Sequence, residues 1–362
     1  MNSIRESDVF NFRTFKSRAA ILFFGLTLTA GTVVSAETTG RTRTTARPAA
    51  TKSSSTRSRT SGAAKAKARV ARIREARAKA ARALAEASTP RYRTDEQGNV
   101  VPAIRAAAAI IYDPASGKVL WEENSQDERS IASITKVMTA IVFLESATDL
   151  NREIQITRAD TLRASTTYLR TNDRVRIADL LHLLLLPSDN AAARALARVS
   201  PLGYDAFIAR MNQKAEDLGL DHTAYVDPSG LLADNISSAY DMARLIAFAG
   251  EDDRIGPIMR TPEYSFRTAG PGAGRIITVR STNQILRAGD VDVRGGKTGF
   301  ISKAGYCLAT LLKLPQGGPS LAVVVLGANS NLGRFWETRH LLSWLSDRTQ
   351  LLGLATPAVA GQ

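Results

Sequence analysis

The stretch AAAAIIYDPASGKVLWEEN, residues 106–124, has the pattern of two β-strands joined by a tight turn. Apolar, β-branched and aromatic side chains are concentrated on both sides of the turn, as is typical of strands. The Asp-Pro-Ala-Ser-Gly segment between them contains the proline and glycine that turns use for their backbone angles. We therefore expect a hairpin near the start of the folded part.

Strand-like runs return only towards the other end of the chain. After about residue 263 they are EYSFRT (263–268), RIITVR (275–280), VRGGKTGF (293–300), GYCLATLLK (305–313) and SLAVVVLGAN (320–329). The stretch from about 150 to 250 is mainly helical, and a last helix, LGRFWETRHLLSWLSDR (332–348), follows the strands. This order predicts an α/β fold in which the two ends form one antiparallel sheet, helices cover it, and a helical subdomain is inserted.

The net charge of +14 is concentrated in one segment. Residues 41–90 hold 14 Lys and Arg against 2 Asp and Glu, a net of +12, whereas residues 1–40 (4 − 3) and 91–362 (30 − 29) each hold +1. The folded part is close to neutral, which argues against a nucleic-acid-binding face. We expect residues 37–95 to be a basic tether, partly disordered and partly helical, with an anionic membrane or wall surface as its partner.

The first 36 residues resemble an export signal. Four basic residues precede the apolar run AAILFFGLTLTAGTVV (19–34), and the small residues Ser35 and Ala36 follow it. This order is that of a signal peptide, and the apolar run is short for a membrane span. We expect cleavage after Ala36, with an uncleaved amino-terminal anchor as the alternative. In either case the folded part would lie outside the cytoplasm, in the periplasm.

Several common catalytic sites are absent from the sequence. The histidines His182, His222 and His340 accompany no Gly-x-Ser-x-Gly elbow, which argues against a Ser-His-Asp hydrolase. The sequence contains no His-Glu-x-x-His motif or Cys/His cluster, and its one cysteine, Cys307, cannot form a disulfide within the chain. We therefore expect neither a metal nor another cofactor.

Three short motifs occur in order: Ser133-Ile-Thr-Lys136, Ser188-Asp-Asn190 and Lys297-Thr-Gly299. On a helix the side chains of Ser133 and Lys136 lie one turn apart on the same face, which suits a nucleophile and its base. Each motif is weak alone, since Ser-x-Asn occurs again at Ser281-Thr-Asn283 in strand-like sequence. The order of the three motifs and their contexts make the set specific.

With these motifs the chain resembles the serine D,D-peptidases of the low-molecular-weight penicillin-binding protein family (peptidase family S11). Within that family it is most similar to the D-alanyl-D-alanine endopeptidase branch (penicillin-binding protein 7 type). The resemblance covers about residues 100–346 and includes IASITKVMTA, PSDNAAARALA, YVDPSGL, STNQIL and GGKTGF. It implies a β-lactamase/transpeptidase-like catalytic domain over residues 100–349, with a five-stranded antiparallel sheet. The implied activity is hydrolysis of D-Ala-D-Ala peptide bonds in peptidoglycan, with β-lactam antibiotics as covalent inhibitors.

The resemblance also assigns catalytic roles. Ser133 is the implied nucleophile and forms the acyl-enzyme; the positive end of the helix dipole would favour its developing alkoxide. Lys136 is the implied base, which requires a depressed pKa, and both burial and the nearby cation of Lys297 would lower it. Ser188 is implied to relay the proton between the lysine and the leaving amine.

The implied substrate-binding residues are Asn190, Lys297, Thr298, Gly299 and Phe300. Asn190 would hold the peptide group of the substrate, and Lys297 and Thr298 would bind the carboxylate beside the scissile bond. Gly299 would leave room for a peptide laid along the strand edge. The N–H of Phe300, with that of the nucleophile, would form the oxyanion hole.

Three other functions stay open at this point. The nearest is a D-alanyl-D-alanine carboxypeptidase; we expect the endopeptidase because only residues 350–362 follow the last helix, too few for the second domain of the carboxypeptidase branch. A class A β-lactamase needs a further glutamate, and the nearest candidate, Glu216, lacks the asparagine expected after Glu-x-x-Leu. The third is a wall-binding protein without catalytic function, but every motif residue is intact.

Overall fold

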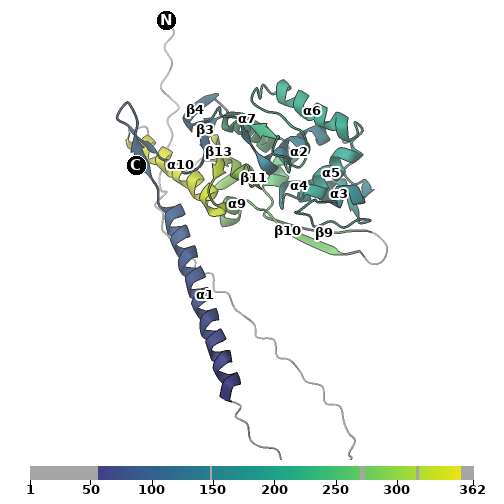
Figure 1. The fold of residues 1–362 in the computed structure, drawn as a ribbon. Helices are drawn as coiled ribbons and strands as arrows, with labels where there is room; N and C mark the ends of the chain where they lie inside the picture. The colour runs from purple at the N-terminus through teal and green to yellow at the C-terminus, as the bar shows by residue number, and fades with distance from the viewer. Residues whose placement is uncertain (1–55, 147–148, 270–273, 315–317, 352–362) are drawn as a thin grey trace, which may run out of the picture. The chain divides into compact units, whose positions relative to one another are not determined.

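The structure is a computed structural model that describes residues 56–146, 149–269, 274–314 and 318–351 (Figure 1). The predicted signal segment, residues 1–36, lies outside the described residues. By its internal contacts the chain divides into two units, Thr14–Ala85 and Glu86–Gln362, the latter together with Met1–Arg13. None of the helices in the described residues has the length and apolar character needed to cross a membrane.

Helix α1 (Thr56–Ser88) supplies the described part of the first unit. Its sequence is rich in alanine, lysine and arginine, all of which favour helix. Its large apolar side chains, Val70, Ile73 and Leu84, are exposed. Because no apolar stripe runs along the helix, it has no face that requires burial in a core.

The second unit is built on a five-stranded antiparallel sheet with the strand order β11-β12-β13-β3-β4 (Figure 1). Its strands are β3 (Ala108–Asp113), β4 (Lys118–Glu123), β11 (Asp292–Ile301), β12 (Gly305–Lys313) and β13 (Ser320–Ala328). The strands from the two ends of the catalytic region meet where β13 pairs with β3, with Val324 opposite Ile110. This arrangement confirms the predicted sheet and leaves β11 as an edge strand.

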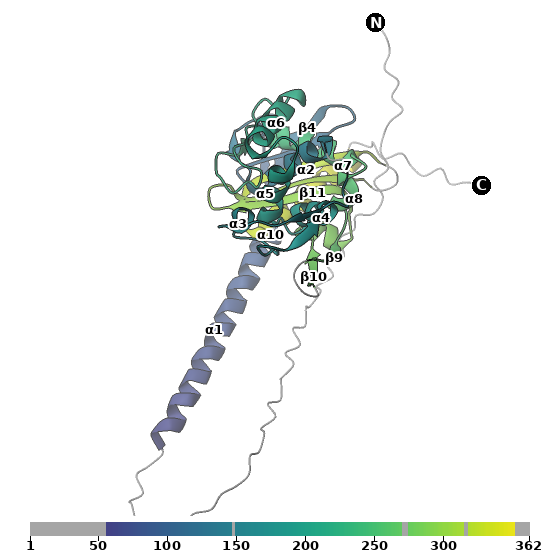
Figure 2. The ribbon, with the colours of Figure 1, turned by 90° about the vertical axis from the view of Figure 1, so that its right-hand side faces the viewer.

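Helices cover both faces of this sheet (Figures 1 and 2). The covering helices are α7 (Ala239–Glu251) on one face and α10 (Asn331–Leu351) on the other. Successive side chains of a strand point to opposite faces, so each central strand contributes to two cores. Ile110 and Val324 belong to the core with α7, whereas Ile111 and Val323 belong to the core with α10. This double burial explains why the central strands are apolar almost throughout.

A helical region is inserted between β4 and the strands that return. Its helices are α2 (Thr135–Ser146), α3 (Arg158–Thr161), α4 (Ile177–Leu185), α5 (Asn190–Val199), α6 (Tyr204–Asp217) and α8 (Ile255–Met259). Helix α2 is buried from Thr135 to Leu144 and packs against α4, α5, α6 and α7. This confirms the predicted helical subdomain. The region also contains short strands that were not predicted: β5 (Arg129–Ser130), β6 (Glu153–Gln155), β7 (Arg174–Arg176) and β8 (Ile236–Ser237).

Two predicted strands stay outside the central sheet. β9 (Glu263–Arg267) and β10 (Ile276–Arg280) pair with each other in a separate two-stranded ribbon (Figure 1). Phe266, Ile277 and Val279 are buried, and the residues beside them are exposed or only half-buried. A strand with one apolar face cannot fill a position that is covered on both sides, so the ribbon lies apart.

The segment Ser281-Thr-Asn283 is not part of a strand, contrary to expectation. Asn283 is the N-cap of a short helix, α9 (Gln284–Ala288), and its side chain accepts a hydrogen bond from the Ile285 N–H. Asparagine is favoured at this position because its side-chain oxygen satisfies an N–H at the start of a helix.

The second unit begins earlier than the expected boundary near residue 100. β1 (Tyr92–Thr94) pairs with β2 (Val100–Pro102) in an antiparallel hairpin. Trp344 of α10 donates from Nε1 to the Val100 carbonyl at 2.9 Å. His340 of the same helix lies 3.1 Å from the Ser88 carbonyl. These contacts tie the residues before β3 to α10.

Candidate active site

Ser133 lies in a tight turn directly before the buried helix α2. Ala132–Ile134 form a 3-10 turn (η1), and α2 begins at Thr135. The Ala132 backbone has a φ of 48°, a left-handed conformation that is strained for a residue with a Cβ. Ser133 retains some exposure, whereas both of its neighbours are buried. The turn therefore presents one hydroxyl at the amino-terminal end of α2.

Lys136 follows one turn later and is fully buried. Its Nζ lies 3.0 Å from Ser133 Oγ, 2.6 Å from Asn190 Oδ1 and 2.5 Å from the Ser229 carbonyl oxygen. The last two atoms can only accept, so each binds an N–H of the lysine. A neutral amine has two N–H groups and one lone pair, and these acceptors leave the lone pair for Ser133 Oγ. The geometry therefore fits an amine that takes the proton of the hydroxyl.

Burial favours this neutral amine. Loss of hydration lowers the pKa of Lys136 from 10.5 to about 7. The carboxylates of Asp227 and Asp189 act in the opposite direction and raise this pKa, and the guanidinium of Arg194 lowers it. Lys136 therefore loses its proton near neutral pH.

Lys297 is the second buried lysine of the site. Its Nζ donates to Ser188 Oγ at 2.8 Å and to the Thr298 carbonyl at 2.7 Å. Burial, and then the positive charges of Lys136 and Arg334, lower the pKa of Lys297 well below its ordinary value of 10.5. Burial is thus the largest cause for both lysines. The positive charge of Lys136 lowers the pKa of Lys297, but the expected lowering of the Lys136 pKa by Lys297 is not seen.

Ser188 and Asn190 lie on either side of Asp189, which caps helix α5 by accepting from the Ala192 N–H at 2.9 Å. Ser188 has a φ of 66°, so the backbone turns sharply just before the helix. This turn directs the Ser188 hydroxyl to Lys297, and it places Asn190 on the first turn of α5, beside Lys136. The second motif is thus brought between the two lysines.

Both N–H donors of the Asn190 side-chain amide are used within the protein. Its Nδ2 donates to the Ala164 carbonyl at 2.7 Å and to Ser165 Oγ at 3.2 Å, while its Oδ1 accepts from Lys136. Asn190 therefore orients the lysine directly. To donate to a substrate peptide, the amide must exchange one of its two present N–H bonds, whereas Oδ1 has a second lone pair with which to accept.

Thr298 and Phe300 lie on the edge strand β11, as predicted. Thr298 Oγ1 is 2.6 Å from Thr282 Oγ1, next to the start of α9. Phe300 is half exposed and stacks on Tyr306 with ring centroids 4.2 Å apart. The third motif therefore offers hydroxyl and backbone groups along a strand at the edge of the described sheet.

Gly299 was expected to leave room for a substrate, but in the structure it leaves room for the turn that carries Ser133. A Cβ at this position would lie 2.8 Å from the Ile131 carbonyl oxygen and 3.1 Å from the Ser133 backbone nitrogen. The glycine therefore faces the nucleophile turn, and its small size allows β11 to approach η1 closely. This approach brings the backbone of the third motif to the backbone of the first.

The loop of residues 227–235 belongs to the site and was missed in the sequence. The carbonyl of Ser229 binds Nζ of Lys136, as described above. The Asp227 carboxylate holds the loop by accepting from the N–H groups of Ser229 (2.6 Å) and Gly230 (2.9 Å). Gly230 has a φ of 74°, and a Cβ there would lie 2.0 Å from the Ala132 carbonyl. The segment YVDPSGL that contains Ser229 could be recognised in the sequence. Its contact with Lys136 could not be predicted, because every residue has a backbone carbonyl.

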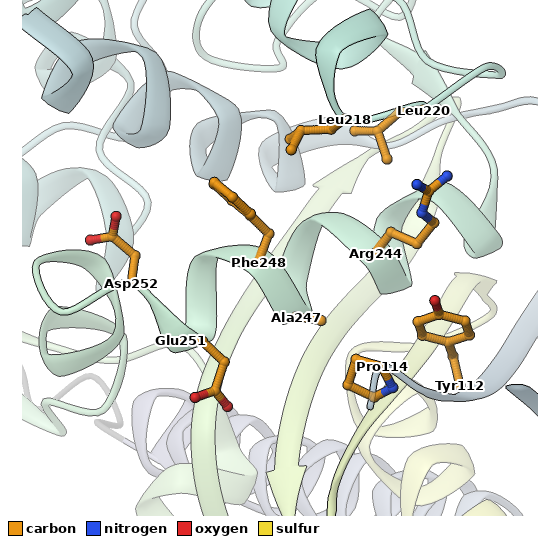
Figure 3. A pocket seen from close by; sticks show the side chains of 9 residues that line it. All are labelled: Tyr112, Pro114, Leu218, Leu220, Arg244, Ala247, Phe248, Glu251 and Asp252. Carbon is orange, nitrogen blue, oxygen red and sulfur yellow. The ribbon is translucent and has the colours of Figure 1, made fainter. Parts of the chain in front are cut away.

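Two other features lie apart from this site. A pocket of about 530 Å³ is lined by Tyr112, Leu220, Arg244, Phe248 and Glu251, among others, and three of these project from α7 (Figure 3). No residue of the three motifs lines it. Glu216, the candidate for a β-lactamase glutamate, is exposed on α6 and binds Gln213 of the same helix at 3.0 Å. This gives the β-lactamase interpretation no support.

Comparison with known proteins agrees with this geometry. The family model Peptidase_S11, D-alanyl-D-alanine carboxypeptidase, matches residues 95–330. The chain belongs to this family. The S11 chain is 32% identical to the D-alanyl-D-alanine endopeptidase of Escherichia coli (strain K12), over 67% of this chain and 78% of the relative. It is 33% identical to the D-alanyl-D-alanine endopeptidase of Pseudomonas aeruginosa, over 67% and 77%.

Solved structures show the same fold. The Streptomyces K15 DD-transpeptidase is 28% identical to this S11 chain and superposes with a TM-score of 0.63, over 67% of this chain and 97% of that one. A D-alanyl-D-alanine carboxypeptidase from Mycobacterium tuberculosis H37Rv is 27% identical, with a TM-score of 0.60 over 72% and 96%. The predicted family and fold class are confirmed.

Proposed function

We propose that this S11 chain is a serine D-Ala-D-Ala peptidase that acts on peptidoglycan stem peptides through an acyl-enzyme on Ser133. The observation that carries the proposal is the set of bonds around Lys136. Its buried Nζ lies 3.0 Å from Ser133 Oγ, and two oxygens that can only accept occupy its N–H groups. Membership of the family supports the same assignment.

In acylation, Ser133 Oγ attacks the carbonyl carbon of the scissile bond, and its proton passes to Lys136 Nζ. The carbonyl oxygen becomes negative and accepts hydrogen bonds from the backbone N–H groups of Ser133 and Phe300. The C–N bond then breaks. The leaving amine takes the hydroxyl proton of Ser188, which regains one from Lys136. The products are a free amine, a neutral lysine and an ester on Ser133.

In deacylation, a water molecule takes the place of the released amine. Lys136 accepts a proton from this water as it attacks the ester, and the proton then returns to Ser133 Oγ as the acyl product leaves. In a β-lactam the amide nitrogen stays attached to the acyl group after ring opening. The leaving group therefore remains in the site, and the acyl-enzyme persists.

Lys297 and Thr298 suit the carboxylate beside the scissile bond. Lys297 is buried, and no acidic side chain forms an ion pair with it among the described residues. A substrate carboxylate would supply the missing negative charge and favour the protonated form of the lysine. The Thr298 hydroxyl lies on the adjacent position of the edge strand and adds a donor.

The preferred reaction is cleavage of cross-links between stem peptides, with removal of a terminal D-alanine as the alternative. Three relatives named D-alanyl-D-alanine endopeptidase are 32–33% identical and match over 77–87% of their length. Relatives named D-alanyl-D-alanine carboxypeptidase match over 61–63% of theirs. The fuller match to the endopeptidases supports the first reaction.

The amino-terminal residues also support a proposal for where the protein acts. We infer export through residues 1–36 into the periplasm, where peptidoglycan lies, and contact of the basic tether with an anionic wall or membrane surface. The charge of +12 within residues 41–90 supports this contact, since opposite charges attract over roughly a Debye length of 10 Å at 0.1 M salt.

The test is incubation with a labelled penicillin followed by peptide mapping. We expect the label on Ser133 and none on the Ser133→Ala variant; label that survives in this variant would refute the assignment. Purified cross-linked dimers and monomeric pentapeptide stems, offered in parallel, separate the two reactions. Dimers that persist while pentapeptides are trimmed would make the protein a carboxypeptidase.

A further inference from the structure

Arg334 of helix α10 is a buried cation next to the site, and it has no acidic partner among the ion pairs of the described residues. Its guanidinium lies against the rings of Tyr306 and Phe335, 5.6 Å and 4.9 Å from their centroids. Burial lowers the pKa of Arg334 to about 10, so it remains charged at neutral pH. Burying an arginine without a carboxylate is unfavourable unless its donors are well used.

Three neutral oxygens receive hydrogen bonds from the two Nη groups, whereas Nε is buried without a hydrogen-bond partner among the described residues. Nη1 of Arg334 donates to the carbonyls of Gly299 at 2.9 Å and Cys307 at 3.1 Å, two residues that are paired across β11 and β12. Nη2 donates to Asn331 Oδ1 at 2.5 Å. The guanidinium thus extends from α10 to the sheet and binds the Gly299 carbonyl of the third motif.

The Gly299 carbonyl and the Phe300 N–H belong to one peptide group. This group is planar and trans, so its C=O and N–H point in opposite directions. The carbonyl points to β12 and Arg334, and the N–H therefore points to the open edge of β11. Fixing the carbonyl also fixes the direction of that N–H.

On one face of the sheet, the same residue touches the turn that carries Ser133. The Cα–Cβ direction of Gly299 leads to the Ser133 backbone nitrogen, 3.1 Å from the position of a Cβ. The peptide held by Arg334 therefore lies beside the N–H that the proposed mechanism uses with that of Phe300. A rotation of this peptide would move one of the two oxyanion donors and leave the other in place.

We propose that Arg334 is a positioning residue for the oxyanion hole: it locks the Gly299–Phe300 peptide so that the Phe300 N–H is aimed at the developing oxyanion. The proposal rests on the peptidase function proposed above. A charge-assisted bond to the carbonyl also polarises the peptide, which makes its N–H a stronger donor. Arg334 acts through this peptide and does not touch the substrate.

The experiment compares Arg334→Gln with Arg334→Lys, which retains a positive charge but lacks the planar fork. Two quantities are measured for each: the acylation rate constant with a fluorescent penicillin, and the affinity for phenylboronic acid. This boronate adds to the nucleophile as a tetrahedral anion and carries no carboxylate. Losing a whole oxyanion donor lowers kcat by roughly 10²–10³. For a misdirected donor we expect both quantities to fall together by about tenfold to a hundredfold in Arg334→Gln, and by less in Arg334→Lys.

Two further variants keep the test decisive. Asn331→Ala alters only an exposed partner of the guanidinium, so it should fold and show a smaller fall of the same kind, about threefold. Arg339→Gln is the matched control, since Arg339 lies on the same helix and pairs with Asp290 at the surface. We expect Arg339→Gln to leave both quantities unchanged. If Arg334→Gln does not fold, the other variants decide.

The outcomes separate this proposal from the proposed function. If the unaltered protein reacts with neither penicillin nor the boronate, the peptidase function is wrong. If it reacts but the Arg334 and Asn331 variants keep its boronate affinity, the positioning role is wrong. Unchanged boronate affinity with a KM that rises only for substrates bearing a free carboxylate would make Arg334 a carboxylate-binding residue and overturn the proposal.

Discussion

At the scale of residues, the proton transfer proposed for Ser133 depends on the hydrogen bonds of Lys136. The Asn190 side chain and the Ser229 carbonyl occupy its N–H groups, and the remaining direction leads to Ser133 Oγ. Burial supplies the neutral form, while the charges of Asp227 and Asp189 limit how far the pKa falls. The balance leaves a base that is poised near neutral pH.

This balance predicts the pH dependence of acylation. In the proposed mechanism the neutral form of Lys136 is the base, and its pKa is about 7, so the rate should rise through about pH 7 and then level off. Asp227→Asn removes a negative charge that raises this pKa; the rising limb should therefore move to lower pH. The measurement is the acylation rate constant with a fluorescent penicillin between about pH 5 and pH 9.

Asp160→Asn is the control for this shift. Asp160 is a buried carboxylate like Asp227, but it pairs with Arg198 at 2.8 Å and does not act on Lys136. Its removal should affect stability without moving the limb. A limb that stays in place in Asp227→Asn, or moves equally in Asp160→Asn, would contradict the role given to Asp227.

At the scale of elements, the site depends on the fit between β11 and η1. The strand and the turn are more than 150 residues apart in the chain, since η1 ends at Ile134 and β11 begins at Asp292. They touch at Gly299, where a side chain would collide with backbone atoms on the other element. Backbone atoms cannot rotate away as a side chain does, so the contact tolerates little change.

Gly299→Ala should therefore separate the two elements. The new methyl group would push against the Ile131 carbonyl and the Ser133 nitrogen, at 2.8 Å and 3.1 Å. Displacement of a reacting group by about 1 Å lowers rates by roughly 10²-fold, and we expect a fall of this order in the acylation rate constant.

Gly117→Ala is a matched control for that substitution. Gly117 lies between β3 and β4 with a φ of 71° and no atom near the position of a Cβ. The left-handed backbone should destabilise the variant by roughly 1–2 kcal/mol, seen as a lower Tm, with no change in acylation. If both glycine variants lose acylation in proportion to Tm, the effect is one of general stability and not of the contact between β11 and η1.

At the scale of the whole molecule, the excess positive charge and the three motifs lie in different units. The segment Thr14–Ala85 forms its own unit, and the described side chains of α1 up to Glu86 are exposed. Ala87 is buried and the Ser88 carbonyl lies 3.1 Å from His340, and both residues precede the hairpin of β1 and β2. The boundary that matters for stability therefore lies near Glu86.

A variant that starts at Glu86 should keep the acylation rate of the full chain and its Tm. It should lose salt-sensitive binding to anionic vesicles or wall fragments, because all 14 Lys and Arg of residues 41–90 are removed. A variant that starts at Ala103 is the comparison; it loses β1, β2 and the bond from Trp344, so its Tm should fall. A lower Tm in the Glu86 variant would show that α1 is part of the fold.

Local sequence by itself determined much of this protein. The hairpin of β3 and β4, the apolar strands β11 to β13 and the last helix follow from runs whose period or composition is set by near neighbours. The pairing of Ser133 with Lys136 also follows, because residues three apart on a helical turn lie on the same face. The confinement of the charge to one segment is a property of composition alone.

The tertiary structure decided the rest. The Ser229 carbonyl lies 93 residues from Lys136 in the chain, and Arg334 lies 35 residues from the Gly299 carbonyl that it holds. Every residue has a backbone carbonyl, so the sequence does not show which carbonyl will bind a side chain. A glycine likewise does not show whether it leaves room for a substrate or for another part of the chain. Which strands share a sheet, why Gly299 is small and where Arg334 directs its donors depend on contacts between distant segments, and those contacts exist only in the folded chain.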